Sequence, residues 1–107
     1  MVVNLIEWSS KISRAEENRQ GISPLTEQIE GLTLKDAYSI QLEIIHKKVN
    51  EGDKITGKKI GLTSVAMQQL LNVDEPDYGH LLQSMEIQDN ELNCSECLKP
   101  RVEAEIA

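Results

Sequence analysis

The stretch Ile-Thr-Gly-Lys-Lys-Ile-Gly-Leu-Thr, residues 55–63, marks the point at which the hydrophobic pattern of the chain changes. Before it, apolar residues recur at helical spacing, and after it they alternate with polar ones. The stretch itself is interpreted as a strand that contains Gly57 and Gly61. Glycine inside a strand marks a bulge, or a place where another group approaches the backbone. The change of period predicts the α+β class, with N-terminal helices followed by short strands.

The first helix is predicted to begin after Asn4, because Asn4 and Glu7 have the spacing of a capping box. Apolar residues follow at helical spacing, and the helix is expected to end near Gln20, since Gly21 supplies a stop. Residues 22–30 are interpreted as a connector, because Ser23 precedes Pro24 and a residue before proline disfavours the helical conformation.

A second capping signal, formed by Thr33 and Asp36, predicts a second helix that ends at the turn-forming residues 51–53. His46 lies at the edge of the apolar stripe of this helix, and we interpret it as a packing or surface residue. The helical region is therefore expected to cover residues 1–52, and a mixed α/β region residues 53–107.

After the strand, Thr63 or Ser64 is expected to cap a short helix that runs through Met67, Leu70 and Leu71. Residues 74–79 are interpreted as a turn-rich loop. Residues 88–96 are polar and predict a surface loop or a hairpin.

The last stretch, Lys-Pro-Arg-Val-Glu-Ala-Glu-Ile-Ala at 99–107, alternates polar and apolar residues and predicts a strand over residues 100–107. In a strand, Glu103 and Glu105 would point the same way, roughly 6.6 Å apart along the backbone. Two such carboxylates can converge on one hard cation such as magnesium. A solvated strand face, with Arg101 paired to one of the glutamates, is the alternative.

Length and composition limit the function classes. A chain of 107 residues forms at most one domain, and the lack of phenylalanine implies an aliphatic core. With 11 basic and 18 acidic residues, the formal net charge of −7 argues against a nucleic-acid partner and is compatible with cation binding. No apolar run is long enough to cross a membrane and no secretory pattern opens the chain, so the expectation is a cytoplasmic protein without a membrane partner.

The two cysteines, Cys94 and Cys97, form a C-x-x-C motif. A redox role would need a strand-to-helix context, which is not visible. A zinc site would need two more ligands, and His46 and His80 do not have the spacing of a zinc finger. Ordinary reduced thiols are therefore the default interpretation.

Two further positions carry possible chemistry. A lysine between glycines, Lys58 or Lys59 beside Gly61, could be desolvated and transfer protons, although surface lysines are the commoner case. Asp77 could act in the same way, or it could only form a turn.

Taken together, four blocks of the sequence resemble the 2-keto-4-pentenoate hydratases, which belong to the fumarylacetoacetate hydrolase superfamily together with the 4-oxalocrotonate decarboxylases. The blocks are GKKIGLTS at 57–64, MQ at 67–68, VDEPDYGHL at 73–81 and KPRVEAEIA at 99–107. The resemblance runs from the first helix to the end of the chain, and the order and spacing of the blocks make it specific for the family but not for one activity.

The resemblance implies a metal-dependent hydro-lyase of aromatic-compound catabolism that adds water to a 2-hydroxy-2,4-dienoate to give a 4-hydroxy-2-oxo acid. Glu103 and Glu105 match the two metal ligands of the family's Glu-x-Glu block, which bind Mg²⁺ or Mn²⁺. Lys59 matches the family's lysine and Asp77 its loop aspartate, and both shuttle protons. The implied partner is a small 2-oxo or 2-hydroxy-dienoate, and the full-length form is expected to be a homo-oligomer.

Family chains continue well beyond the block at 99–107, and their third metal carboxylate comes from that later part. The chain is therefore interpreted as a single domain that forms the N-terminal portion of a fumarylacetoacetate-hydrolase-like fold, and it is expected to be inactive by itself. Two alternatives stay open. One is a 4-oxalocrotonate-type decarboxylase, and the other is a truncated, non-catalytic module of the same family.

Overall fold

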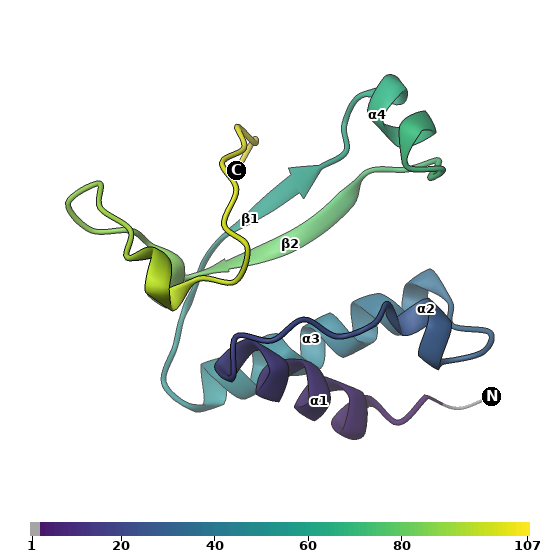
Figure 1. Cartoon of the computed structure of the whole chain (residues 1–107), viewed down its shortest axis with the longest axis horizontal. Coiled ribbons are helices and arrows are strands. Elements are labelled where there is room, and N and C mark those ends of the chain that lie inside the picture. Colours follow the sequence, from purple (N-terminus) through teal and green to yellow (C-terminus); the bar gives the residue numbers. More distant parts are fainter. Residues whose placement is uncertain (1–2) are drawn as a thin grey trace.

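The computed structural model describes residues 3–107, in which N-terminal helices are followed by a β-hairpin and a long irregular C-terminal segment (Figure 1). The N-terminal helices lie below the hairpin in this view, and the C-terminal segment returns to the outer side of the hairpin. This arrangement confirms the α+β class and the order of helices before strands. Residues 1–2, part of the predicted helical region 1–52, lie outside the described residues.

Helix α1 (Leu5–Glu17) begins as predicted, because Asn4 Oδ1 accepts a hydrogen bond from the backbone N–H of Glu7 at 3.0 Å. The carboxylate of Glu7 does not bond to the backbone of Asn4, as a capping box would require. It lies 3.3 Å from Lys11 Nζ, one turn further along the helix. Asn4 therefore acts as the N-cap, while Glu7 forms an i,i+4 ion pair on the helix surface.

The chain leaves α1 earlier than the predicted end near Gln20, because Arg19 adopts a left-handed φ of 50°. The connector 22–30 was predicted to lack helix, and this is wrong: it contains α2 (Leu25–Gln28). Pro24 is the N-cap residue of α2, with an extended ψ of 138°. Proline is no obstacle to a helix that begins immediately after it, since its fixed φ suits the helix start.

Helix α3 (Leu34–Asn50) has the predicted capping box. The backbone N–H of Thr33 donates to Asp36 Oδ2 at 2.9 Å, and the N–H of Asp36 donates to Thr33 Oγ1 at 3.1 Å. The hydrogen bonds from Thr33 hold the pKa of Asp36 below its ordinary value.

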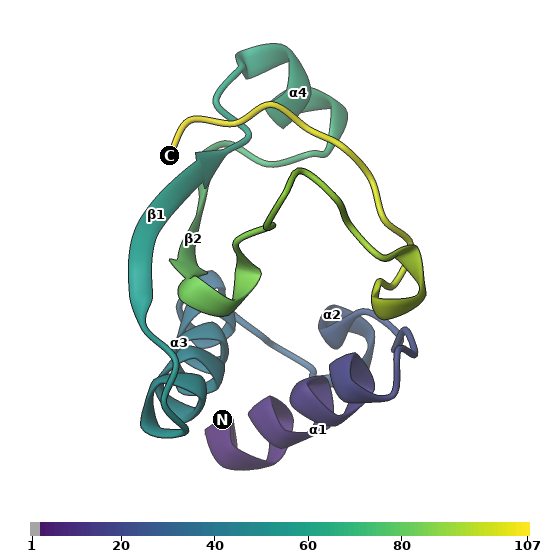
Figure 2. The same cartoon turned by 90° about the vertical axis from the view of Figure 1, so that its left-hand side faces the viewer.

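Helices α1 and α3 pack against each other (Figure 2), and α3 carries buried apolar residues of the helical part. Ile40 is only 1% exposed, and Ile29 and Ile45 are also buried. At the surface of the same interface, Lys48 Nζ of α3 lies 3.1 Å from a carboxylate oxygen of Glu16 of α1. Apolar burial, rather than the exposed ion pair, stabilises this contact.

The hairpin consists of β1 (Ile55–Gly61) and β2 (Asp77–Leu82), which pair antiparallel. The ladder is irregular between Ile55 and Gly57, as glycine within a strand predicts. Strand β2 corrects the sequence analysis, which placed a loop over residues 74–79. Asp77 and Gly79, two of the first three residues of β2, are weak strand formers, so the strand here depends on pairing with β1.

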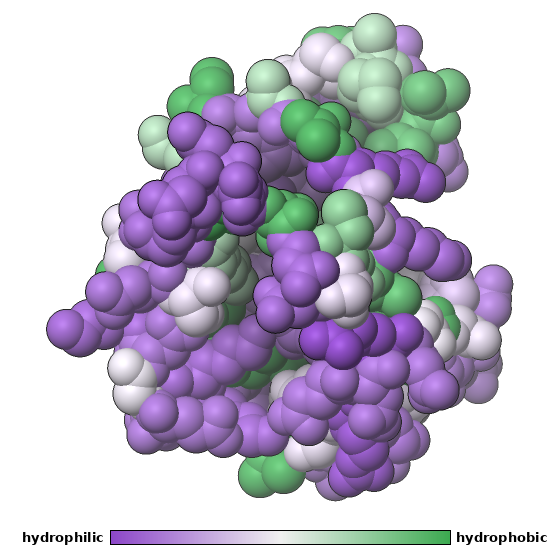
Figure 3. All heavy atoms as spheres, turned by 60° about the vertical axis from the view of Figure 1, so that its left-hand side comes forward, coloured by the Kyte–Doolittle hydropathy of each residue, from purple (hydrophilic) through white to green (hydrophobic). Residues whose placement is uncertain are grey.

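Helix α4 (Val65–Leu70) connects the two strands and is capped by Ser64, whose Oγ accepts from the N–H of Met67 at 3.2 Å. Its apolar side chains are largely exposed: Val65 by 66% and Leu70 by 73%. Figure 3 shows apolar atoms gathered at this end of the molecule.

One face of the hairpin contacts α3 through two tyrosines. The ring centroids of Tyr38 and Tyr78 are 5.8 Å apart, and the Tyr38 hydroxyl accepts from the backbone N–H of Tyr78 at 3.1 Å. Gln41 Nε2 donates to the carbonyl of the same residue at 3.4 Å. The face that carries Tyr78 is therefore turned to the helices, and the other face is left for different contacts.

The predicted strand over residues 100–107 is wrong. This segment is exposed and irregular, and within residues 3–107 its only ladder contact is an isolated bridge in which Ile60 N–H donates to the carbonyl of Ile106 at 3.3 Å. The alternating pattern needs an apolar surface for one of its faces, yet Val102 is fully exposed. Without that burial, the pattern does not produce a strand.

The chain between β2 and this segment forms two 3₁₀ turns, η1 (Gln83–Met85) and η2 (Cys94–Glu96). Of the two possibilities for residues 88–96, the structure therefore shows the loop and not the hairpin. None of the helices formed by the described residues has the length and apolar character needed to cross a membrane.

Candidate active site

Lys59 and Asp77 lie on one face of the hairpin, and each stands opposite a glycine. In the ladder Lys59 pairs with Gly79, and Gly61 pairs with Asp77. Residues two apart in a strand share a face, and so do residues directly opposite each other in an antiparallel pair. The ladder thus places Lys59 and Asp77 diagonally across one face, away from the face that carries Tyr78.

The C-terminal segment adds a carboxylate to this face. Lys59 Nζ donates to Glu105 Oε2 at 2.7 Å, and the two side chains are 41% and 25% exposed. Because these residues come from different elements, this ion pair and the backbone bridge at Ile106 together hold the segment against β1.

The ion pair determines the charge state of both partners. The hydrogen bond to Glu105 raises the pKa of Lys59 above its ordinary value of 10.5, partial burial opposes the shift, and the negative charges of Glu105, Asp77 and Glu103 add to it. The same hydrogen bond lowers the pKa of Glu105 below its ordinary value of 4.5. Lys59 is therefore an ammonium group near neutral pH, and the desolvated, easily deprotonated lysine considered from the sequence is not what the structure shows.

Gly61 lies between two carboxylates. A Cβ atom built on Gly61 would stand 2.5 Å from Asp77 Oδ1 and 3.3 Å from Glu105 Oε1. Both carboxylates therefore flank the same point on the sheet, with Lys59 beside them. Three of the four predicted site residues thus converge, while Glu103 acts on Lys59 through its charge.

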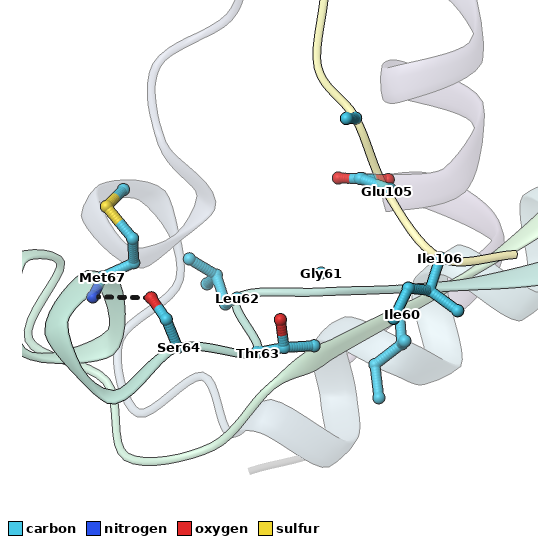
Figure 4. Close-up of a pocket in the computed structure, with 9 residues that line it drawn as sticks. Ile60, Gly61, Leu62, Thr63, Ser64, Met67, Glu105 and Ile106 are labelled. Atoms are coloured by element: carbon cyan, nitrogen blue, oxygen red, sulfur yellow. Dashed lines mark hydrogen bonds between the residues drawn. The ribbon is translucent and has the colours of Figure 1, made fainter.

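A pocket of about 420 Å³ opens beside this cluster. Figure 4 shows Glu105 and Ile106 from the C-terminal segment on one side, and β1 with the turn into α4 on the other. The walls are mostly apolar, with Thr63, Ser64 and Glu105 as polar members. Such a mixture suits a small organic ligand that has an apolar portion and a few polar groups.

Other residues considered from the sequence lie elsewhere. Lys58 pairs with His80 and alternates to the opposite face from Lys59. His46 is an exposed residue of α3. Both cysteines are free thiols, Cys94 exposed and Cys97 half-buried.

The residues present fit a divalent cation only in part. Within residues 3–107, no group of three or more His, Cys, Asp or Glu side chains is arranged to hold a metal ion. Glu105 Oε2 is hydrogen-bonded to Lys59, which leaves Oε1, over Gly61, as the oxygen that could coordinate. Carboxylates are the ligands that hard cations prefer, but the set in this chain is incomplete.

Sequence reasoning did not identify Gly61 and Gly79 as part of the site, although it placed Gly61 in the strand. Their signal was available: glycine in a strand indicates close approach of another group. Which group approaches depends on the ladder register and on the position of the C-terminal segment, and neither can be read from glycine spacing.

Comparison with known proteins agrees with the four sequence blocks. The chain is 37% identical over 100 residues to 2-hydroxyhexa-2,4-dienoate hydratase of Comamonas testosteroni, an alignment that covers 91% of this chain and 38% of that protein. It is 39% identical over 101 residues to 2-keto-4-pentenoate hydratase of Paraburkholderia xenovorans, covering 94% and 38%. No protein-family model matches the chain.

The fold has a counterpart among solved structures. The 4-oxalocrotonate decarboxylase of Pseudomonas putida G7, complexed with calcium and acetate, superposes with a TM-score of 0.85 at 32% identity, over 92% of this chain and 39% of that one. The same decarboxylase with magnesium and adipate gives 0.74 at 34% identity, over 78% and 33%. The chain is therefore similar in sequence and fold to the first part of the 2-keto-4-pentenoate hydratases and the 4-oxalocrotonate decarboxylase, and it spans about two fifths of the length of the relatives that it matches.

Proposed function

We propose that the polypeptide carrying this chain is a metal-dependent hydro-lyase that adds water to a 2-hydroxy-2,4-dienoate, giving a 4-hydroxy-2-oxo acid in aromatic-compound catabolism. The observation that carries the proposal is the convergence of Lys59, Asp77 and Glu105 around Gly61, beside a pocket with mostly apolar walls. The hydratase names of the sequence relatives support the substrate class.

The two proposed catalytic residues have complementary charge. Lys59 carries an ammonium group near neutral pH, so it can stabilise negative charge on the 2-oxygen of the substrate or give up a proton. Asp77 offers a carboxylate on the same sheet face and can take a proton from one substrate atom and return it to another. Conversion of the dienol to its keto form, followed by addition of water to the remaining double bond, requires proton transfers of this kind.

Glu103 and Glu105 are the proposed ligands of Mg²⁺ or Mn²⁺, with the remaining oxygen ligands supplied by water or by a carboxylate from outside this chain. When bound, the cation would stabilise enolate charge as a Lewis acid. The relative solved with magnesium and with calcium supports a divalent cation. Because Lys59 holds one oxygen of Glu105, the ammonium group would also keep this ligand oriented when the site is filled.

The proposal is tested by incubating the longest polypeptide that contains this chain with 2-hydroxypenta-2,4-dienoate and following the loss of the dienoate absorbance. We expect turnover that is abolished by EDTA and restored by Mg²⁺ or Mn²⁺, with a 4-hydroxy-2-oxo acid as the product. Absence of turnover in the longest polypeptide that contains this chain, with either metal present, would refute the hydratase assignment.

The second candidate is a decarboxylase of the 4-oxalocrotonate type, which the structural match at a TM-score of 0.85 favours. The products separate the two candidates. A decarboxylase releases CO₂ from a 2-oxo-dioate without taking up water, so measurement of CO₂ with 4-oxalocrotonate as substrate distinguishes them.

A further inference from the structure

The space above Gly61 is filled by side chains from two other segments. A Cβ on Gly61 would meet Asp77 Oδ1 at 2.5 Å, closer than real Cβ contacts allow, and Glu105 Oε1 at 3.3 Å, which is also tight. The backbone of Gly61 does not have a positive φ, so its conformation is open to other residues. What the position requires is therefore the missing side chain, not the conformational freedom of glycine.

A second glycine has the same relation to the other proposed catalytic residue. A Cβ on Gly79 would stand 3.3 Å from both Cγ and Cε of Lys59. Gly57 provides a contrast, because a Cβ there would make an ordinary contact with Leu81, at 3.7 Å from its Cδ1. The tight approaches in the hairpin thus occur where a glycine faces Asp77 or Lys59 across the ladder.

We propose that Gly61 is a positioning residue of the candidate active site: it leaves the space in which the Asp77 carboxylate lies across the sheet, next to Glu105 and Lys59. Its catalytic consequence rests on the proposed function, whereas the positioning itself does not. Gly79 plays the matching part for Lys59, since it leaves room for the aliphatic stem that extends toward Glu105.

The test is Gly61→Ala, with Gly57→Ala as the matched control in the same strand. The atom that the new Cβ displaces is the end of a side chain, so the Asp77 carboxylate should rotate away while the strand stays intact. Three-bond Hα–Hβ couplings of Asp77, measured by NMR, report its χ1 rotamer. The ¹³C chemical shift of the Asp77 carboxylate reports in addition on a rotation about χ2, which moves Oδ1 while Cγ stays at its ordinary distance of 3.6 Å from the new Cβ. We expect the couplings or the carboxylate shift to change in Gly61→Ala and both to stay as in the wild type in Gly57→Ala. If both were unchanged in Gly61→Ala, the proposal would be overturned.

Turnover gives the second readout. Misplacement of a reacting group by an ångström can lower the rate about 10²-fold, so we expect kcat to fall by this order in Gly61→Ala, with KM little changed. If the Asp77 couplings change while Asp77→Ala turns over like the wild type, Gly61 still positions Asp77, and it is the catalytic assignment of Asp77 that fails.

A rescue experiment covers the case in which Gly61→Ala lowers the melting temperature. The double variant Gly61→Ala with Asp77→Ser should then regain the lost stability, because the shorter serine side chain does not occupy the place of the new Cβ. Failure of this rescue would mean that the alanine acts through the backbone, and it would contradict the proposal.

Discussion

The helix pair α1–α3 and the hairpin face with Lys59 differ in the range of the interactions that form them. The N-terminal ends of the helices are fixed by hydrogen bonds between residues three apart, such as Thr33 and Asp36. Their apolar residues recur every three or four positions, which is about one helical turn. The hairpin face depends on Lys59 and Glu105, which are 46 residues apart. Helix α3 of the first region contributes the buried Ile40 and Ile45, whereas the hairpin contributes the buried Leu82. The hairpin face with Lys59 is partly exposed and carries the candidate chemistry.

The comparison predicts that the helix pair matters mainly for stability and the Lys59 face of the hairpin mainly for the proposed chemistry. Substitutions in the helix pair should change the free energy of unfolding, and substitutions on the hairpin face should change turnover. A substitution that changes both the free energy of unfolding and turnover would contradict this separation.

The largest effect is expected from Lys59→Ala and Asp77→Ala. In the full-length context, each should lower turnover about 10²–10⁴-fold, the usual contribution of a general acid or base, while leaving metal binding intact. The melting temperature should change little, because Asp77 is exposed and Lys59 only half-buried. Lys58→Ala is the matched control, since this neighbour lies on the opposite face. Wild-type turnover in both variants, measured by dienoate absorbance, would end the catalytic assignment.

Ile40→Ala should have the largest effect on stability. Ile40 is a buried residue of α3 that is only 1% exposed. Truncation of such a residue to alanine lowers the free energy of unfolding by about 2–5 kcal/mol. Leu42→Ala on the same helix, where the side chain is 39% exposed, should cost much less. Urea unfolding followed by circular dichroism measures both. Equal losses would show that α3 is not packed as described.

Thr33→Ala tests the local part of the comparison. It removes the hydroxyl that accepts from the N–H of Asp36, and loss of an N-cap side chain destabilises a protein by about 1 kcal/mol. Thr26→Ala, in the short helix α2, is the control, because Thr26 is not a cap residue. A loss in Thr33→Ala no larger than in the control would contradict the role of the capping box.

The smallest effect concerns the docking of the C-terminal segment and its dependence on pH. Glu105 has a lowered pKa in the folded state, so its contribution is present above its ordinary pKa of 4.5 and is lost as the pH falls through the folded value. Lys59 has a raised pKa, so its contribution is complete below 10.5 and is lost as the pH rises through the folded value. Docking should therefore be strongest between about pH 4.5 and 10.5.

The readout for docking is the hydrogen-exchange protection of the Ile60 amide, which donates to Ile106 in the C-terminal segment. Protection should fall on the acid side of the window, and Glu105→Gln should remove this pH dependence. If protection of Ile60 followed pH identically in Glu105→Gln, the ion pair with Lys59 would not be what holds the segment.

Much of the fold follows from local signals. The two N-caps at Asn4 and Thr33, a strand that begins at Ile55, and the short helix after Ser64 were predicted. Strand β2 was missed because Asp77 and Gly79 favour turns and become part of a strand only through pairing with β1. The strand at 100–107 was predicted in error, because an alternation of polar and apolar residues forms a strand only where another surface buries the apolar side chains.

For the site, the sequence by itself determined the residue types: a lysine, an aspartate and two glutamates, in blocks that resemble a known family. Only the tertiary structure decided that Lys59 faces Glu105, that Asp77 faces Gly61, and that Lys58 points away. The physical reason is range. Helix caps and helical periodicity involve residues a few positions apart, so they can be recognised from a short stretch of sequence. The ladder register and an ion pair between residues 46 positions apart depend on how the whole chain packs.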